Sequence, residues 1–361
     1  MAKARSLRFA TLLALLALCA AGPAAAGNTS PQRPPIQLGT SGGTADDRAG
    51  SSCCSGTLGS LVMLDGAPYI LSNNHVLARA GGAAAGVDII QPGLIDANCL
   101  PQGTHVVANF AGDLVPLGTA NVDVALAKAV PGQVDRLGTI LGLGVPCAAI
   151  AQAAPGLAVT KSGRTTGMTK GTVQAVDVTV SIEYQKKCND GPMFSEVFIG
   201  QIAIDPGCFS APGDSGSLIL SDPAKGGRHP VGLLFAGSSS ITIANPIGDV
   251  VAAFQAGGHR FGFVGGKCPA RREEETLRGP SRLAVERARS VKEAHEAELF
   301  TRLHVLGVGV GKASDEPVEA EVAIVVYVEA SGNSLPVDVD VPAEIDGVKV
   351  RIVPTDRFVA R

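Results

Sequence analysis

From Thr57 to Ala244 the chain consists of short apolar runs that are broken by Gly, Pro and Asn. The runs read as strands and recur at near-regular spacing, which favours an all-β barrel or sandwich over alternating βαβ units. They are TLGSLVML, APYILSNN, THVVANF, VDVALAKAV, GTVQAVDVTVSIEY, EVFIGQIAI, GSLIL, HPVGLLFAGS and SITIA.

Helical patterns begin only after these runs. The apolar spacing of IGDVVAAFQA, directly after Asn245-Pro246, predicts a closing helix. Residues 267–283 are charged and turn-rich, which indicates a linker between a domain of residues 52–266 and a domain of residues 284–361. In the second domain, a helix over 284–303 precedes LHVLGVGVG, AEVAIVVYVE and VKVRIVPT, so we expect a small α+β domain of unknown role. Its GVGVG lacks the GxGxxG spacing of nucleotide loops and predicts a strand and turn.

The N-terminal residues have the pattern of an export signal. A positively charged start, an apolar run over residues 9–21 and small residues up to Ala26 predict a signal peptide over 1–26. No later segment has 18 uninterrupted apolar residues, so we expect a secreted or periplasmic protein without a membrane partner after cleavage. Residues 27–51 are polar and rich in Pro and Gly, and we expect them to be extended or loose.

Charge and cysteine content narrow the partners further. A net charge of −3 gives no sign of a nucleic-acid partner. Seven cysteines follow residue 26, so an exported chain should form disulfides and leave at least one thiol free or intermolecular. Cys188 and Cys208, which flank a strand-like run, are the favoured pair. No CxxC pair or Cys/His cluster appears, so we expect neither a metal site nor a cofactor.

Three residues in separate motifs could together perform nucleophilic acyl transfer, which needs a nucleophile, a base and a group that orients the base. Ser215 lies between two glycines in PGDSGS, and His75 ends the run YILSNNHVL. Asp123 lies inside the apolar run NVDVALAKA, where a carboxylate needs a hydrogen-bonding partner. The chain order is His75, Asp123, Ser215.

The motifs SNNHV, VDVAL and PGDSGS, in this order, resemble those of the chymotrypsin-like serine peptidases. The segment KSGRTTGMTKGTV resembles the Ser-Gly-x-Thr-Thr-Gly segment of bacterial streptogrisin-type members. The resemblance covers about residues 52–255. It implies a double six-stranded β-barrel with a closing helix, and a secreted serine endopeptidase with polypeptide substrates.

The resemblance also implies roles for individual residues. Ser215 would attack the scissile carbonyl, His75 would take its proton, and Asp123 would orient His75. The backbone N–H groups of Gly213 and Ser215 would form the oxyanion hole. In bacterial members a basic residue pairs with the aspartate before the serine, so Lys161, or failing that Arg164, would pair with Asp214.

The specificity pocket is less well determined by the sequence. The strand 231–238 resembles the pocket wall of the family, with Phe235, Ala236 and Gly237 at the substrate-pairing edge, and Phe209 should lie near the pocket base. No acidic residue occurs there, which disfavours Arg or Lys and favours a small or apolar side chain.

Two alternatives stay open at this point. An α/β-hydrolase would use Ser215, Asp249 and His259, but it needs G-x-S-x-G before a helix, whereas Leu218 replaces the second glycine and a strand-like run follows. A catalytically silent or latent exported binding module of the peptidase fold would keep the same three residues. In either case the C-terminal domain could contact the rest of the chain, bind substrate or a partner, or assist folding.

Overall fold

The computed structural model describes residues 26–188, 190–222, 226–269, 280–314, 321–330 and 334–360. The predicted signal peptide, apart from Ala26, and most of the predicted linker lie outside these ranges. Within them, no helix is both long and apolar enough to cross a membrane.

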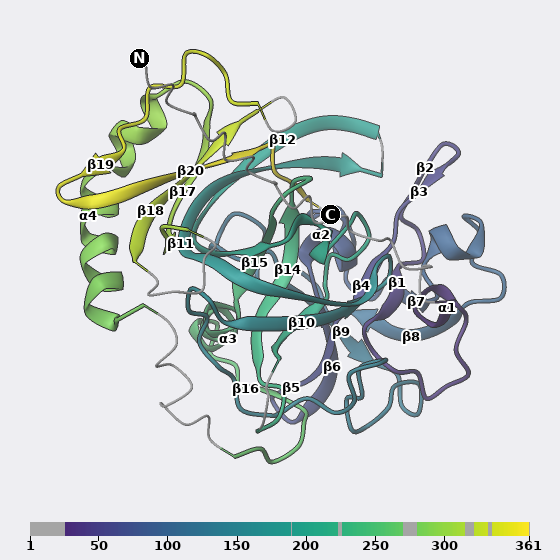
Figure 1. The fold of residues 1–361 in the computed structure, drawn as a ribbon. Coiled ribbons are helices and arrows are strands. Elements are labelled where there is room, and N and C mark those ends of the chain that lie inside the picture. The colour runs from purple at the N-terminus through teal and green to yellow at the C-terminus, as the bar shows by residue number, and fades with distance from the viewer. Residues whose placement is uncertain are drawn as a thin grey trace, which may run out of the picture.

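The first half of the chain forms a closed barrel (Figure 1). β4 and β5 are the two halves of one bent strand: β4 pairs with β1 and β5 pairs with β6, and this closes the ring β1-β7-β8-β9-β6 into six strands. The short strand β16 (Phe261–Phe263) adds to the free edge of β5. The barrel strands are β1 (Thr40–Thr44), β4 (Gly56–Leu58), β5 (Ser60–Leu64), β6 (Ala67–Ser72), β7 (Asp88–Gln91), β8 (His105–Phe110) and β9 (Ala125–Ala129).

The second half closes in the same way. Its strands follow the order β10-β13-β14-β15-β12-β11, and β11 pairs back with β10 to complete a ring of six. The helix α3 (Ile247–Ala256) follows, at the residues where the sequence predicts a closing helix. The predicted double six-stranded barrel is therefore confirmed. The strands are β10 (Ala158–Gly163), β11 (Gly167–Lys187), β12 (Asp190–Asp205), β13 (Leu218–Ser221), β14 (Pro230–Gly237) and β15 (Thr242–Pro246).

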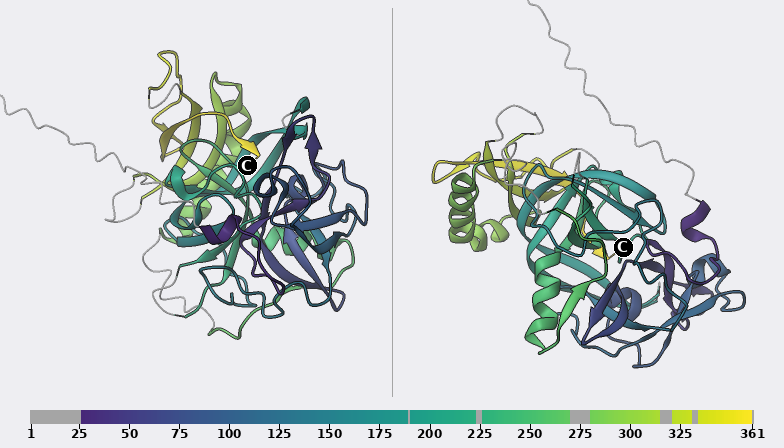
Figure 2. Two further views of the ribbon diagram at one scale, coloured as in Figure 1. Left: turned by 90° about the vertical axis from the view of Figure 1, so that its right-hand side faces the viewer. Right: turned by 90° about the horizontal axis from the view of Figure 1, so that it is seen from below.

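The C-terminal part is α+β, as expected. The helix α4 (Arg282–Thr301) packs on β17 and β18, on the outer side of the molecule (Figure 2). β17 and β18 are antiparallel, β18 and β20 are parallel, and β19 pairs with β20. The strands are β17 (Val305–Lys312), β18 (Val322–Glu329), β19 (Glu344–Ile345) and β20 (Val348–Thr355).

This C-terminal sheet is continuous with the second barrel, because β17 also pairs with β11. The predicted turn at GVGVG is wrong, since these residues lie inside β17. Their glycines permit a close approach: a Cβ on Gly309 would lie 2.7 Å from Val178 Cγ2, and one on Gly311 would lie 2.4 Å from the Gln174 carbonyl oxygen. Apolar side chains of β18 and β20 share a core cluster with those of β11.

The last described strand, β21 (Val359–Ala360), leaves the C-terminal sheet and returns to the barrels. It pairs antiparallel with β14 and parallel with β11. In all three views the chain accordingly ends over the middle of the molecule (Figures 1 and 2).

Part of the segment expected to be loose, residues 27–51, belongs to the first barrel. β1 is fully buried between β4 and β7, and a Cβ on Gly42 would lie 2.4 Å from Leu58 Cγ. The glycines that indicate a loop in the sequence are therefore required for close packing of this strand. The remaining short elements are α1 (Ala26–Thr29), β2 (Arg48–Ala49), β3 (Ser52–Cys53), α2 (Asn74–Leu77), η1 (Leu94–Ala97) and η2 (Gly207–Phe209).

Between described residues, three disulfides join distant parts of the chain, and they correct the predicted pairing. They are Cys53–Cys99, Cys54–Cys188 and Cys147–Cys268. Cys188 is bonded to Cys54 and not to Cys208, from which the 16-residue strand β12 separates it along the chain. Among the described cysteines none is free, Cys208 included, so the expectation of a free thiol is wrong for this part of the chain.

Candidate active site between the two barrels

His75 lies in α2, the single turn of helix that follows β6. Its Nδ1 lies 2.6 Å from Asp123 Oδ2, and the Asp123 side chain is fully buried. Asp123 comes just before β9, the barrel neighbour of β6, so adjacent strands carry the two side chains to the same end of the barrel.

The buried carboxylate of Asp123 is satisfied from several sides. The backbone N–H groups of Asn74 and His75 donate to Oδ1 at 2.6 and 3.3 Å, and the Tyr184 hydroxyl donates to Oδ2 at 2.9 Å. Burial, and then the nearby Asp123 carboxylate, raise the pKa of Tyr184 well above its usual value, so its phenol stays protonated and donates. These hydrogen-bond donors, rather than an excess of basic side chains, offset the free-energy cost of burying the carboxylate.

Two asparagines fix the backbone of Asp123. Asn73 Nδ2 and Asn245 Nδ2 both donate to its carbonyl oxygen, at 2.8 and 3.1 Å, and Asn245 Oδ1 accepts its N–H at 3.2 Å. The sequence reading identified neither these residues nor Tyr184 as part of the site. The pair Asn73-Asn74 beside His75 was a usable signal, whereas Tyr184 comes from the other barrel and had none.

Ser215 lies in a glycine loop, which we define as residues 210–217, between η2 and β13. Its hydroxyl donates to the Phe235 carbonyl oxygen at 3.2 Å, and its own carbonyl accepts the Thr57 N–H at 2.8 Å. Thr57 belongs to β4 of the first barrel, and its carbonyl accepts a hydrogen bond from Ser72 Oγ at 2.7 Å. Ser72 is the last residue of β6, three positions before His75.

The glycine loop and α2 meet at Gly56. A Cβ on Gly56 would lie 2.5 Å from Val76 Cγ2 and 3.0 Å from the Ser215 carbonyl oxygen. A Cβ on Gly59, at the bend between β4 and β5, would lie 2.0 Å from the Gly216 carbonyl oxygen. The two barrels therefore approach at backbone distance, and this contact brings the loop of Ser215 against the segment that carries His75.

Four N–H groups around the nucleophile position differ in their use within the glycine loop. Asp214 N–H donates to the Ala211 carbonyl at 3.0 Å, and Gly216 N–H donates to the Leu234 carbonyl at 2.9 Å. Across the described ranges, the N–H groups of Gly213 and Ser215 have no such bond. Gly213 adopts φ +99°, a conformation that favours glycine. The loop thus offers one N–H donor on each side of Asp214, from Gly213 and from Ser215.

The side chain of Asp214 turns away from these donors and into the second barrel. Lys161 Nζ lies 3.2 Å from its Oδ2, and both side chains are fully buried. Oδ1 accepts the N–H groups of Thr165 and Thr166 at 2.8 and 3.2 Å, and Oδ2 accepts the Thr166 hydroxyl at 2.7 Å. Burial lowers the pKa of Lys161, and the Asp214 carboxylate opposes that shift.

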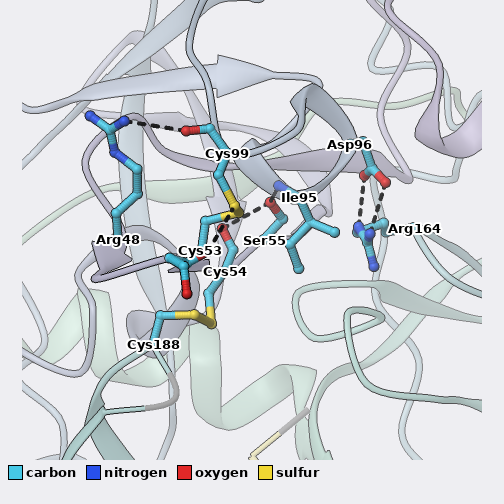
Figure 3. Close-up of a disulfide and its surroundings, with 10 residues drawn as sticks. Arg48, Cys53, Cys54, Ser55, Ile95, Asp96, Cys99, Arg164 and Cys188 are labelled. Carbon is cyan, nitrogen blue, oxygen red and sulfur yellow. Dashed lines mark hydrogen bonds and ion pairs between the residues drawn. A yellow bond between two sulfur atoms is a disulfide. The ribbon is translucent and has the colours of Figure 1, made fainter.

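Arg164, the second candidate partner of Asp214, binds elsewhere. Its Nε and Nη2 donate to Asp96 in a two-pronged contact at 2.7 and 2.8 Å (Figure 3). Asp96 lies in η1, next to the Cys53–Cys99 disulfide. A Cβ on Gly213 would lie 2.7 Å from Arg164 Nη1, so the guanidinium lies against the glycine loop.

Burial also affects a carboxyl near His75. It raises the pKa of Asp47 to about 6, against the influence of Arg79, which lowers it. Because this pKa exceeds the ordinary value of 3.8, the folded chain holds the proton more firmly than the unfolded chain does. The contribution of Asp47 to stability is therefore most favourable below pH 3.8, and it falls as the pH rises from 3.8 to about 6.

Of the four predicted pocket residues, Phe209 lies apart from Phe235, Ala236 and Gly237, which are consecutive in β14. Phe209 is fully buried in one core cluster of the second barrel, with Val159 and Ile204. Phe235 and Ala236 belong to another cluster, which also contains Phe358 from the C-terminal segment. Gly237 ends β14 and pairs with β21.

The α/β-hydrolase alternative is wrong. The fold has two antiparallel barrels, and strand β13 follows Ser215 where that alternative needs a helix. His259 Nδ1 pairs with Asp65 Oδ2 at 2.7 Å on the surface, and Asp249 lies in the first turn of α3.

A family model described as the Nal1 C-terminal domain matches residues 102–244. No curated protein matches. Matching solved structures include a glutamic acid-specific serine protease (21% identity, TM-score 0.43, 63% of this chain and 100% of that chain). They also include Thermobifida fusca protease A (18%, 0.41, 64% and 99%) and Cellulomonas bogoriensis chymotrypsin (22%, 0.37, 62% and 97%).

The fold assignment itself rests on the strand pairing of the two closed barrels. The two closed six-stranded barrels and the helix that follows them have the architecture expected for the chymotrypsin-like fold.

Proposed function

We propose that the chain is a serine endopeptidase that hydrolyses polypeptides through an acyl-enzyme. The observation that carries this proposal is the contact of His75 Nδ1 with the buried Asp123 carboxylate, at the strand end that packs against the loop of Ser215. A histidine held by a buried carboxylate beside a serine hydroxyl is the arrangement that activates a weak nucleophile.

In this mechanism the Ser215 hydroxyl attacks the scissile carbonyl while His75 Nε2 accepts its proton. Asp123 holds the Nδ1 proton of His75 and stabilises the imidazolium that forms. The oxygen of the tetrahedral intermediate binds the N–H groups of Gly213 and Ser215. His75 then protonates the leaving amine, and water hydrolyses the acyl-enzyme by the reverse sequence of proton transfers.

We further propose that Lys161 supports this site by holding Asp214, so that the donors of Gly213 and Ser215 face the substrate without a proteolytic activation step. The buried contact of Lys161 with Asp214, and the use of Arg164 by Asp96, support Lys161 over Arg164 in this role. Lys161 is a positioning residue, since it does not contact the reacting atoms.

The environment and the substrate are part of the proposal. Three disulfides support an exported protein, because such bonds persist in oxidising compartments, and the segment 161–173 supports kinship with the streptogrisin-type members. With Phe235 and Ala236 in an apolar surrounding, we propose a small or apolar side chain on the acyl side of the cleaved bond.

The test is covalent labelling by a fluorescent fluorophosphonate, followed by peptide mass analysis. We expect label on Ser215, and none in Ser215→Ala or His75→Ala. His105→Ala, which alters an exposed histidine of the first barrel, is the matched control and should label normally. If the folded protein takes no label at Ser215, the peptidase proposal fails, and the catalytically silent binding module of the same fold becomes the better description.

A further inference from the structure

The edge of β14 beside Ser215 is occupied by the chain's own last strand. β13 pairs with β14 only as far as Leu233, and beyond that point the same edge pairs with β21. In the antiparallel register Val359 lies opposite Gly237, and Ala360 lies opposite Ala236. The next residue of β14 is Phe235, whose carbonyl accepts the hydrogen bond from Ser215 Oγ.

The polarity of β21 has chemical significance. Its chain direction runs from the level of Gly237 to that of Ala236, and therefore towards Ser215. A peptide bound for attack by Ser215 must approach with its acyl half, the part N-terminal to the scissile carbonyl, running the same way. An extended strand that adds to an open sheet edge is also the common mode of peptide binding to β proteins.

The strand is held in place by side chains that precede it. Asp356 Oδ1 accepts the Ser239 N–H and the Ser239 hydroxyl, each at 2.7 Å, and Thr355 Oγ1 donates to Ser238 Oγ at 2.6 Å. The Phe358 side chain is 1% exposed, and its carbonyl accepts the Glu183 N–H at 3.0 Å. The segment 355–358 is thus anchored on Ser238 and Ser239, which follow β14, and on Glu183 of β11.

β21 also reaches the other side of the site. It pairs with Glu183 of β11, and the neighbouring Tyr184 donates to Asp123. The strand therefore spans the space between the β14 edge beside Ser215 and the β11 strand that supports Asp123.

We propose that β21 is an intramolecular occupant of the substrate-strand site, and that it keeps the enzyme in a self-blocked state that peptides must displace. This inference rests on the proposed peptidase function. Because the competing strand is part of the same chain, its effective concentration is high and dilution does not remove it.

The experiment compares the full chain with three variants that keep the anchors of segment 355–358. Val359→Pro removes the backbone N–H of that residue and disfavours pairing, whereas Val359→Ala keeps the N–H and is the matched control. A chain that ends at Phe358 lacks β21 altogether. Each is tested for fluorophosphonate labelling, which needs the activated Ser215 but not the β14 edge, and for turnover of a tetrapeptide anilide, which needs both. Hydrogen exchange of residues 234–238 is measured in a Ser215→Ala background.

We expect KM for the tetrapeptide to fall by about tenfold in Val359→Pro and in the shortened chain, because the blocked state no longer reduces apparent affinity. Exchange at 234–238 should become faster in the same two variants, and Val359→Ala should behave as the full chain. Unchanged KM and unchanged exchange in both would overturn the inference, even where fluorophosphonate labels Ser215. Faster exchange without labelling in any variant would support occupancy of the edge and count against the peptidase proposal.

Discussion

At the scale of single residues, the site depends on how one buried carboxylate is satisfied. Asp123 accepts hydrogen bonds from a tyrosine of the other barrel and from two backbone N–H groups of the segment that contains His75. The carboxylate is therefore oriented by both barrels. The Asp123 carboxylate is therefore fully satisfied only when the two barrels are packed against each other. Hydrogen bonds from the first barrel alone would not create this dependence.

Substitution Tyr184→Phe tests this. It keeps the ring in the apolar cluster with Phe198 but removes one donor, and we expect a loss of about 1.5–3 kcal/mol of stability, the range for a hydrogen bond to a charged group. Asp123 Oδ2 would then keep only its contact with His75 and be less well fixed, so labelling of Ser215 should slow by roughly tenfold.

Chemical denaturation and labelling kinetics measure the two effects of this change. Tyr69→Phe, at a partly buried tyrosine of β6, serves as the control and should leave the labelling rate unchanged. Equal labelling rates in Tyr184→Phe and the full chain would show that the phenol plays no part in positioning Asp123.

At the scale of elements, the sequence was informative where a strand has apolar and β-branched residues. The closing helix was predicted to the residue, and the runs around β5, β6, β14 and β18 were recognised. β1 was missed because its TSGGT relies on glycine for close packing, and β21 was missed because two residues carry no pattern. Local sequence indicates how a segment can fold, but close contacts and partner strands are set by the rest of the molecule.

The same limit applied to the candidate site. The sequence offers His75, Asp123 and Ser215 as candidates because each lies in a distinctive motif, and it offers Lys161 through the family resemblance. Tyr184 and Asn245 could not be found, because packing of the second barrel against the first brings them to Asp123 from more than 60 positions away in the sequence.

The bend between β4 and β5 provides a prediction at this scale. In Gly59→Ala the new Cβ would meet the Gly216 backbone, which cannot move without displacing Ser215. We expect a loss of about 1–3 kcal/mol, as for other overpacked interiors, and a clearly slower labelling of Ser215.

Gly262→Ala in β16 is the matched control, since a Cβ there meets nothing within 4 Å. Thermal unfolding and labelling rates of the two variants should differ. Similar behaviour of both would mean that the barrels tolerate a wider separation at the bend than their backbone contact indicates.

At the scale of the whole molecule, the C-terminal part extends the sheet of the second barrel instead of forming a separate body. β17 extends the β11 sheet, Tyr327 donates to Gln174 at 2.9 Å, and the buried Lys292 of α4 donates to Thr179 at 3.1 Å. Phe358 closes the cluster around Phe235. The boundary that the sequence suggested at residues 267–283 is thus crossed by continuous sheet and shared core.

A chain that ends at Pro269, which keeps Cys268, tests this dependence. Removal of the C-terminal part uncovers the apolar face of β11, so we expect lower yield, binding of a dye that detects exposed apolar surface, and a lower unfolding temperature. The chain that ends at Phe358 is the control and should unfold like the full chain. Normal unfolding of the chain that ends at Pro269 would show that the C-terminal part is dispensable for folding.

The disulfides affect how this protein would migrate on a denaturing gel after proteolytic cleavage. Cys54–Cys188 ties the first barrel to the far end of the β11–β12 hairpin, and Cys147–Cys268 ties the connection between the barrels to the segment after β16. A single cut of the peptide chain between residues 150 and 157 would therefore leave both fragments in one covalent particle. On a gel such a nicked molecule would run as intact protein until a reducing agent separated the halves, so its integrity can be judged only after reduction.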